Sequence, residues 1–353
     1  MTSLPGALRT SIVVVNFNDG KYVEDCLASL ERAGGYHELI VIDHASTDGS
    51  PERIEARFPA VRLVRAGKNL GFAGGNNLGA TLATGEVLVL FNPDAFATPG
   101  WLEPLVASLA DANAAIASPK VYRGRPGTTT TIDSAGCDLE FPLGEGPPRG
   151  YLELDDGRFD APADVAYASG AAFAIRLETY RALGGLDETF FCYVEESDLC
   201  WRARMRGLRC VYVPSSLVYH IGSANFGARS PRKIYFQTRN RIRMCLQNYA
   251  AANVAIFVVN EAAHGLCVMA AAPFFPSYRS LGVAYLRAWL GVARNLGLVW
   301  RTRSLRQRER TVGDDVVLRL HRHMGFVSTI ARYRTMARRN ATSLINPSFK
   351  PMA

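Results

Sequence analysis

Segments typical of strands and of helices alternate along the first hundred residues, and this alternation constrains the fold more than any other feature of the chain. Residues 11–15 form a continuous, largely β-branched run that predicts a buried strand. Further strands are expected at 39–42, 61–64 and 87–91, with helices at 21–32, after the turn at 48–51, and at 76–83. This order predicts a parallel sheet with helices on both faces.

Polar residues follow each of these four strands. Ligands of such sheets bind beyond the carboxyl ends of the strands, so four successive polar strand ends predict a binding edge. The residues are Asn16 and Asn18, Asp43 and His44, Asn69, and Asn92 and Asp94.

The segment Asn92-Pro93-Asp94 places a carboxylate directly after a buried strand. Such a carboxylate suits a hard cation that also holds phosphate oxygens. Taken alone, the triplet more often marks an ordinary turn. Asp43, which ends the second strand, is a candidate acceptor of hydrogen bonds from a ribose or base, whereas helix capping explains the nearby Asp48.

The segment 69–77, NLGFAGGNN, is a glycine-rich loop before a helix. Its backbone could approach a nucleotide closely, which makes Asn69, Gly71 and Asn76 candidate nucleotide-binding residues. The segment is not G-x-G-x-x-G and follows the third strand instead of the first. It is therefore a poor match to a dinucleotide-binding motif.

Three carboxylates crowd into the segment Glu195-Glu196-Ser197-Asp198, directly after the aromatic run at 190–193. Carboxylates beside apolar rings gain proton affinity, which suits a general base. Charge compensation at the start of a helix expected at 195–206 accounts for Asp198, but less well for the Glu pair.

His220, at the end of strands expected at 208–213 and 217–219, is a candidate metal ligand, although a single histidine at a strand end is more often structural.

Between these motifs, residues 123–165 are rich in Gly, Pro, Thr and Asp and lack periodicity, which predicts an insertion or long loop over the site. Regular secondary structure is expected to return at 166–175, followed by a helix at 177–183.

Seven cysteines without a C-x-x-C pair argue against a disulfide framework or a zinc site and favour a reducing compartment. The first ten residues lack the pattern of a secretory signal.

The net charge of +8 hides a strong asymmetry. Residues 229–353 hold 21 Lys and Arg against 4 Asp and Glu, a net charge of +17, while residues 1–228 hold 19 against 28, a net charge of −9. A basic half of this kind could face nucleic acid, an anionic membrane or a phosphate-bearing substrate.

Within that basic half, residues 253–276 are strongly apolar but contain Glu261, which favours a buried or interfacial helix over a membrane-spanning one. Arg287, Arg294 and Arg301 recur every seven residues, which holds them near one helical face. Five arginines then fall within 301–310. A lipid-facing helix and a solvated or oligomer-forming face are nearly equal alternatives.

Taken together and in order, these motifs resemble glycosyltransferase family 2, of the GT-A fold. The resemblance covers roughly residues 10–225, and within it the bacterial rhamnosyltransferases that use dTDP-rhamnose are most similar. It implies an α/β fold with a Rossmann-like, mostly parallel sheet, a catalytic domain at 8–228 (nucleotide-binding half 8–122, acceptor half 123–228), and a helical basic region at 229–353. The matching segments are VVVNFN, VIDHASTDGS, NLGFAGGNN, FNPDA, ASGAAFAIR, GGLDETFFCYVEESDLCWR and VYHIGS.

The resemblance also implies roles for individual residues. Asp43 would bind the nucleoside, Asp94 would be the last residue of the metal motif, with Asn92 in place of its first acid, and His220 would be a further metal ligand. The family's Glu-Asp pair, whose Asp is the catalytic base, falls on Glu195-Glu196. Two departures are Glu196 in place of that Asp and His44 in place of a common Asn.

The reaction implied is an inverting single displacement, in which Mg²⁺ or Mn²⁺ neutralises the leaving diphosphate and Glu196 deprotonates the acceptor. The implied partners are a nucleotide-sugar donor, a glycan or polyprenyl-diphosphate-linked acceptor and an anionic membrane surface, with no nucleic acid. The implied location is the cytoplasmic side of the plasma membrane. Alternatives are a UDP-hexose donor, a nucleotidyltransferase, and a non-catalytic membrane- or nucleic-acid-binding protein.

Overall fold

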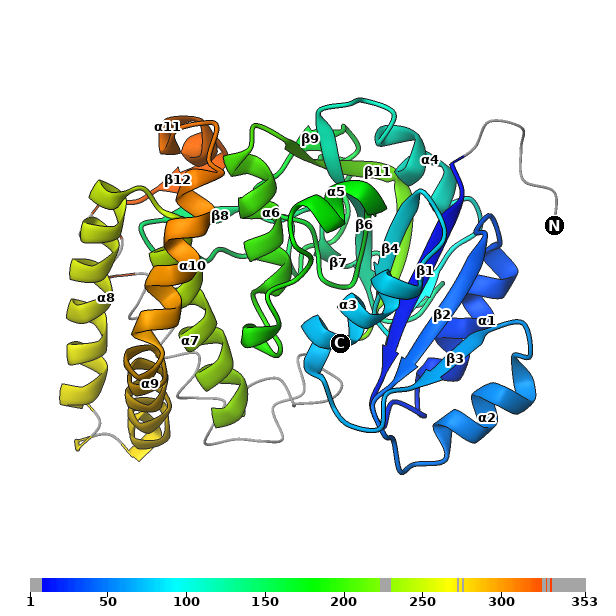
Figure 1. The fold of residues 1–353 in the computed structure, drawn as a ribbon, viewed down its shortest axis with the longest axis horizontal. Helices are drawn as coiled ribbons and strands as arrows, with labels where there is room; N and C mark the ends of the chain where they lie inside the picture. Colours follow the sequence, from blue (N-terminus) through cyan, green and yellow to red (C-terminus); the bar gives the residue numbers. More distant parts are fainter. Residues whose placement is uncertain are drawn as a thin grey trace. The chain divides into compact units, whose positions relative to one another are not determined.

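The computed structural model describes residues 8–222, 230–271, 273–274 and 276–325, together with residues 328 and 331. The chain divides into two compact units (Figure 1). The sheet unit comprises Met1–Asp138 and Pro147–Gly222, and the helical unit comprises Leu139–Gly146 and Ser223–Ala353. The boundary expected after residue 228 lies outside the described residues, as do Ser223 of the VYHIGS segment and the basic residues from 332 onward.

The first half of the sheet unit has the predicted alternation. Runs of buried β-branched and aliphatic residues form the strands, and Pro51 occupies the first turn of α2, where its missing N–H is not needed. The elements are β1 Thr10–Asn16, α1 Val23–Ala33, β2 Glu38–Asp43, α2 Ser50–Arg57, β3 Arg62–Arg65, α3 Gly71–Leu82 and β4 Val87–Phe91.

The prediction of a glycine-rich loop followed by a helix at 76–83 is wrong, because α3 already begins at Gly71. The glycines allow this helix to lie close to the strands beneath it. A Cβ at Gly79 would lie 2.4 Å from Val13 Cγ1, and one at Gly75 would lie 2.6 Å from His44 Nε2. Close helix–strand packing therefore explains these glycines without any ligand.

The rest of the sheet unit completes a ten-stranded sheet whose main path runs β3-β2-β1-β4-β10-β6-β11-β5. The first four strands are parallel, and β10 runs antiparallel to both β4 and β6. The added elements are β5 Ala95–Ala97, α4 Leu102–Ser108, β6 Ala114–Arg123, β7 Ile132–Ser134, β9 Ala163–Asp164, β10 Ala172–Arg176, α5 Leu177–Ala182, η1 Glu188–Phe190, α6 Glu195–Met205 and β11 Arg209–His220.

The two strands expected at 208–213 and 217–219 are in fact one strand, β11, which carries an irregularity in register between Val213 and Leu217. Pro214 lies in this irregular stretch, where its missing N–H costs no regular ladder hydrogen bond. The single long strand carries His220 to the end of the sheet, where it pairs with Ala95 of β5.

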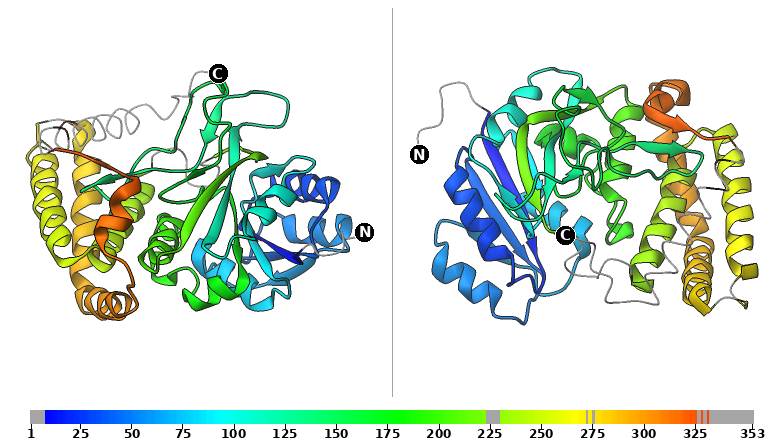
Figure 2. Two further views of the ribbon diagram at one scale, coloured as in Figure 1. Left: turned by 90° about the horizontal axis from the view of Figure 1, so that it is seen from above. Right: turned by 180° about the vertical axis from the view of Figure 1, so that it is seen from behind.

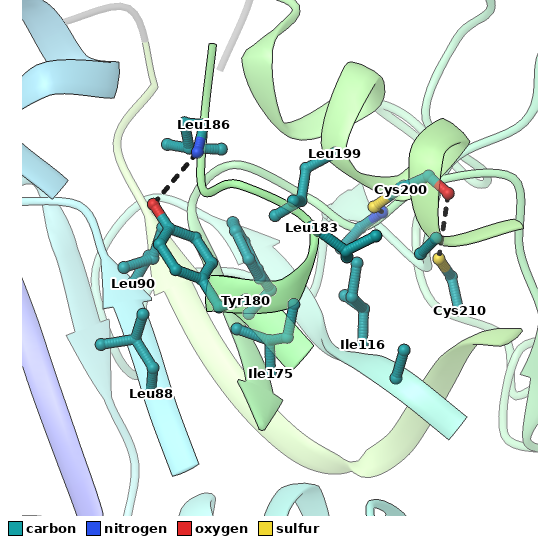
Figure 3. Close-up of a cluster of buried hydrophobic side chains, with 14 of the residues drawn as sticks. Leu88, Leu90, Ile116, Ile175, Tyr180, Leu183, Leu186, Leu199, Cys200 and Cys210 are labelled. Atoms are coloured by element: carbon teal, nitrogen blue, oxygen red, sulfur yellow. Dashed lines mark hydrogen bonds between the residues drawn. The ribbon is translucent and has the colours of Figure 1, made fainter. Parts of the chain in front are cut away.

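Alternate residues of each strand face opposite layers of the core. Val13, Ile40 and Leu88 belong to the layer beneath α3, α5 and α6, while Ile12, Val41 and Val89 belong to the layer beneath α1, α2 and α4. Figure 3 shows part of the first layer, where the Tyr180 hydroxyl accepts a hydrogen bond from the Leu186 N–H (3.3 Å). Both faces of the sheet are thus covered, as the sequence predicts.

The segment 123–165 is more ordered than the predicted long loop, since it contributes β7 and β9 to the sheet edges. Lys120, only 5% exposed, ties the segment down through ion pairs with Asp155 (2.7 Å) and Asp160. The Tyr122 hydroxyl donates to the same Asp155 carboxylate. Alternating apolar residues, the usual signal of a strand, are too few here to reveal these contacts.

The helical unit consists mainly of four long helices that run side by side in Figure 2. These are α7 Pro231–Asn248, α8 Ala251–Ala271, α9 Pro276–Arg294 and α10 Leu296–Arg308, followed by α11 Asp314–Val317, η2 Leu318–Leu320 and β12 His321–His323, which pairs with β8 Leu139–Phe141. The prediction that Arg287, Arg294 and Arg301 lie on one face of a single helix is wrong. The helix α9 ends at Arg294, and α10 starts at Leu296.

The acid in the apolar helix α8, Glu261, is tolerated because it is paired with an arginine of α7. Its carboxylate accepts two hydrogen bonds from Arg241 of α7, at 3.0 and 2.8 Å, and both side chains are almost fully buried. Arg241 also donates to the Leu143 carbonyl oxygen (2.8 Å). By length and composition alone, Ala251–Ala270 is the one candidate membrane span among the described residues, a test that core helices also pass.

Candidate active site

The ends of β1 and β2 meet in a network around Asn16 and Asp43, which are partners in the strand register. The Asn16 side-chain amide donates to Asp43 Oδ1 (2.8 Å) and to the Ser50 hydroxyl (2.9 Å). Asp43 Oδ2 accepts from the backbone N–H of Ser46 (3.1 Å). Both predicted residues are at most 2% exposed, so the Asp43 carboxylate is held in a fixed orientation at the sheet edge.

The loop after β2 is braced against the loop after β1. The Asn18 side-chain oxygen accepts from the Thr47 N–H (2.8 Å), and the Asn18 N–H donates to the Ser46 hydroxyl (2.9 Å). Asp48 accepts from the backbone N–H groups of Gly20 and Ser50, as expected for a residue that organises the start of α2.

The three candidates around α3 differ in accessibility. Asn69 is exposed, and its side-chain oxygen accepts from the Gly71 N–H (2.8 Å) at the start of the helix. Gly71 has φ +72°, and a Cβ there would lie 2.3 Å from the Phe191 carbonyl oxygen. Asn76 is 1% exposed and donates to the Phe72 carbonyl (2.9 Å), so its amide serves the helix and is not brought to the surface of the site.

Asp94 and His220 meet although 126 residues separate them in the chain. Asp94 Oδ1 lies 3.2 Å from His220 Nε2, and the Asn92 amide nitrogen lies 3.5 Å from the same ring nitrogen. The backbone completes the arrangement, because the Ile221 N–H donates to the Asp94 carbonyl (3.1 Å). Two predicted metal-site residues thus share one corner of the sheet with Asn92.

A second carboxylate at this corner, that of Asp133, was not predicted. Asp133 Oδ2 lies 2.9 Å from His220 Nδ1, on the opposite side of the ring from Asp94. Burial acts to lower the pKa of His220, but the two carboxylates outweigh it and raise this pKa to about 10. Burial acts to raise the pKa of Asp94, yet the neighbouring His220 brings it below its ordinary value. No motif in the sequence around Asp133 signals this contact.

The donor set suits a divalent cation held partly by a ligand. Two ligands at right angles around Mg²⁺ or Mn²⁺, each about 2.1 Å from the ion, lie about 3 Å apart. The separation of 3.2 Å between Asp94 Oδ1 and His220 Nε2 fits this geometry. Within the described ranges no group of three His, Cys, Asp or Glu side chains could hold a metal. The remaining coordination positions of such a cation would be open to water or to oxygens of a ligand.

The acidic pair at the start of α6 follows an unusual backbone. Phe191, Tyr193 and Val194 all have positive φ, which is rare for a β-branched residue such as Val194 and is typical of strained functional loops. This turn places Glu195 and Glu196 in the first turn of the helix.

The two glutamates have different environments. Glu195 is 3% exposed, and burial together with the charge of Glu196 raises its pKa well above the usual range. Glu196 is only partly buried, and burial raises its pKa to about 7. A Cβ added at Gly170 would lie 3.3 Å from Glu196 Oε1, so the carboxylate lies against the segment before β10. Glu196 is therefore the better candidate for a base at neutral pH.

Asp198 has a structural role. Its carboxylate is fully buried and accepts from Arg202 Nε (2.8 Å), four residues further along α6. Arg202 also donates to the Gly185 carbonyl (2.8 Å). The third acid of the cluster thus anchors α6 to the preceding loop through Arg202.

Comparison with known proteins places this geometry in context. Residues 11–170 match the family model described as Glycosyl transferase family 2. The N-acetylglucosaminyl-diphospho-decaprenol L-rhamnosyltransferase of Mycobacterium tuberculosis is 28% identical over 231 residues, which cover 59% of this chain and 75% of the relative. The low-salt glycan biosynthesis hexosyltransferase Agl10 of Haloferax volcanii is 27% identical over 241 residues, 65% of this chain and 73% of the relative.

A solved structure has a similar fold. The crystal structure of GalNAc-T7 with UDP, GalNAc and Mn²⁺ superposes with a TM-score of 0.57 at 17% identity, over 83% of this chain. This chain spans 58% of the length of that structure. At such low identity the likeness concerns the fold, and the sheet with helices on both faces is the shared feature.

Proposed function

Because the chain is a glycosyltransferase of family 2, we propose that it transfers a sugar from a nucleotide-sugar donor to an acceptor hydroxyl with inversion at the anomeric carbon. The observation that carries the proposal is the pair Asp94–His220, 3.2 Å apart, at the sheet corner that follows β4. Asp43 and Asn16 end the neighbouring strands and are suited to hold the nucleoside. Asn69, just before α3, and Gly71, its first residue, would border the donor.

Asp94 and His220 are the residues that would hold the divalent cation, with Asn92 beside them. When bound, Mg²⁺ or Mn²⁺ supplies positive charge that stabilises the departing nucleoside diphosphate. The protein side of this arrangement is partly buried, which strengthens the electrostatic interaction.

Glu196 would act as the base. Its carboxylate takes the proton of the acceptor hydroxyl while that oxygen forms a bond to the anomeric carbon, and the bond from that carbon to the diphosphate oxygen breaks on the opposite face. The pKa of about 7 leaves a useful fraction of Glu196 ionised at neutral pH. Burial raises the pKa of the adjacent Glu195 well above its ordinary value, which disfavours a second negative charge next to the base.

For the donor we propose dTDP-rhamnose, supported by the likeness to the mycobacterial L-rhamnosyltransferase. A UDP-hexose is the alternative, supported by the likeness to the Haloferax hexosyltransferase. A thermal-shift panel of nucleotide-sugars with Mn²⁺ separates them, because a ligand that binds only the folded state raises the melting temperature. Selective stabilisation by UDP-hexoses would overturn the rhamnose assignment.

For the acceptor we propose a polyprenyl-diphosphate-linked glycan, by analogy with the acceptor in the name of the mycobacterial relative. Such an acceptor resides in a membrane, and the helical unit is suited to an anionic lipid surface on the cytoplasmic side. Exposed apolar side chains gather on α8, α9 and α10. They include Ile256, Val259, Leu266, Val283, Leu286, Leu290, Leu298 and Trp300.

The charge of these helices favours lipid over other partners. Glu261 is the only acid between residues 251 and 308, and it is buried against Arg241. Arg279, Arg287, Arg294, Arg301 and Arg308 are exposed among the apolar side chains. Aliphatic side chains flanked by arginines suit the interface of an anionic bilayer, because the aliphatic groups can enter the acyl boundary while the arginines meet the headgroups.

The reaction itself is tested by following both products of donor turnover. A glycosyltransferase releases a nucleoside diphosphate and a glycosylated acceptor, while a nucleotidyltransferase would release pyrophosphate. Asp94→Ala should abolish metal-stimulated transfer while the protein stays folded. Normal transfer by that folded variant would refute the metal-assisted mechanism.

A further inference from the structure

The ring of His220 is held from behind by residues that lie far from it in sequence. Asp133 Oδ2 lies 2.9 Å from His220 Nδ1, and Asp133 Oδ1 lies 3.2 Å from Arg123 Nη1. Arg123 lies 3.3 Å from the Tyr151 hydroxyl through the same nitrogen. The ring thus rests on a row of side chains that runs through Asp133 and Arg123 to Tyr151.

The backbone fixes this row in place. His220 of β11 pairs in register with Arg123 of β6, and the Gly124 N–H donates to the His220 carbonyl (2.8 Å). Asp133 is the middle residue of β7, between the buried Ile132 and Ser134. Alternation along a strand sends the Asp133 side chain to the side opposite those two neighbours.

This arrangement determines which ring nitrogen is available. With Nδ1 bound to the Asp133 carboxylate, Nε2 is the nitrogen directed at Asp94, 3.2 Å away. A carboxylate on the far nitrogen of a metal-binding histidine fixes the tautomer and the ring orientation and increases the basicity of the ligand nitrogen.

We propose that Asp133 is a positioning residue, which acts through His220 to hold Nε2 ready for the divalent cation that the donor diphosphate shares. The inference rests on the proposed metal role of Asp94 and His220. Asp133 does not itself reach the cation, because the imidazole ring lies between them. Its contribution is orientation of a ligand supplied by another strand.

The test measures Mn²⁺ binding by the full chain, without donor, from the electron paramagnetic resonance signal of free Mn²⁺. Asp133→Ala should raise the dissociation constant for Mn²⁺ about 10- to 100-fold, the usual cost of losing such a partner. Asp133→Asn should have a smaller effect, because the amide oxygen still accepts a hydrogen bond from Nδ1. An unchanged dissociation constant in Asp133→Ala would overturn the proposal.

The matched control is Asp155→Asn, which removes a second carboxylate of the same segment from its contacts with Lys120 and Tyr122. It should lower the melting temperature and leave the Mn²⁺ dissociation constant unchanged. If it weakens Mn²⁺ binding as much as Asp133→Asn, the effect comes from general loosening of the segment, and the proposal is wrong.

A double-mutant cycle separates this inference from the proposed function. In a His220→Ala background, Asp133→Ala should have no further effect on Mn²⁺ binding, because both changes remove the same interaction. If the effects of Asp133→Ala and His220→Ala on the Mn²⁺ dissociation constant multiply in the double variant, Asp133 does not act through His220. If Asp94→Ala and His220→Ala both leave Mn²⁺ binding intact, the proposed metal site itself fails. If they weaken it while Asp133→Ala does not, only the positioning role fails.

Discussion

The sheet unit and the helical unit both bury charged groups, but they treat them differently. In the helical unit, Arg241 and Glu261 make a two-point ion pair inside the bundle. In the sheet unit, Glu195 and Glu196 are adjacent in α6, neither forms an ion pair with a Lys, Arg or His side chain of the described residues, and burial raises the pKa of each. A paired buried charge maintains packing, whereas an unpaired one is available for proton transfer.

The surfaces differ in the same way. The exposed arginines of the sheet unit mostly meet carboxylates, as Arg65 does with Glu52 and Glu55. The exposed arginines of α9 and α10 have almost no acids near them in sequence. The opposite net charges of the two halves therefore reflect different uses of charge, and each of the following experiments tests that difference.

The largest effect is expected from Glu196→Gln. The amide keeps the shape of the side chain but cannot accept the acceptor proton, so kcat should fall about 10²- to 10⁴-fold, the usual contribution of a general base. The measurement is transfer under saturating donor. Glu153→Gln, at an exposed position paired with Arg158, is the matched control and should retain activity. Equal activity of both variants would remove Glu196 from the mechanism.

The next effect concerns the paired charge of the helical unit. Glu261→Ala removes the closer of two carboxylates paired with the buried Arg241, the other being Glu145 at 3.3 Å from its Nε, and breaking such a buried pair costs about 3–5 kcal/mol. Hydrogen exchange of α7 and α8 should accelerate accordingly. Val259→Ala, at an exposed position of the same helix, is the control and should change exchange little. Similar exchange in both variants would contradict a structural role for the ion pair.

A smaller effect is expected at the surface of the helical unit. The triple variant Arg287→Ser, Arg294→Ser, Arg301→Ser should bind vesicles containing anionic lipid about 100-fold more weakly, at about 1 kcal/mol per arginine. Vesicle flotation measures this, with neutral vesicles as reference. A charge-matched triple change at Arg32, Arg62 and Lys68 of the sheet unit should bind like the parent chain. Self-association without vesicle binding would identify a second copy of the chain as the occupant of this surface.

The smallest effect is the pH dependence of transfer. Glu196 acts as a base only when ionised, so kcat/KM should rise with pH and level off above its pKa of about 7. Activity at pH 6 should therefore be about one-tenth of the plateau. A profile that is flat between pH 5.5 and 8 would show that the ionisation of Glu196 does not govern the reaction.

Much of the fold followed from periodicity. Strands β1, β2 and β4 lie where buried β-branched runs predict them, and the GT-A fold class and the family assignment are confirmed. The errors occur where short-range rules compete with packing. The glycines between residues 71 and 79 favour a loop by their intrinsic propensity. They nevertheless lie in α3, which packs so closely on His44 and Val13 that Gly75 and Gly79 have no room for a side chain.

The sequence identified the individual candidate residues of the site, but it predicted only some of the contacts between them. The strand ends in the sequence indicate that Asn16 and Asp43 meet, because parallel neighbours share an edge. The roles of Asp43, Asp94 and Glu196 remain predictions that the experiments above address. The motif resemblance singles out Glu196 as the base, but the difference in burial between Glu195 and Glu196 depends on how α6 packs in the folded chain.

The sequence by itself determined the alternating sheet, the polar strand ends and the division into acidic and basic halves, because each depends on local pattern or composition. Only the tertiary structure decided that Asp133 contacts His220, that Arg241 neutralises Glu261, and that Glu196 is the more accessible of two adjacent acids. Those outcomes depend on contacts between strands and helices distant in the chain. No local pattern encodes such contacts, since they form only when the sheet and the bundle are assembled.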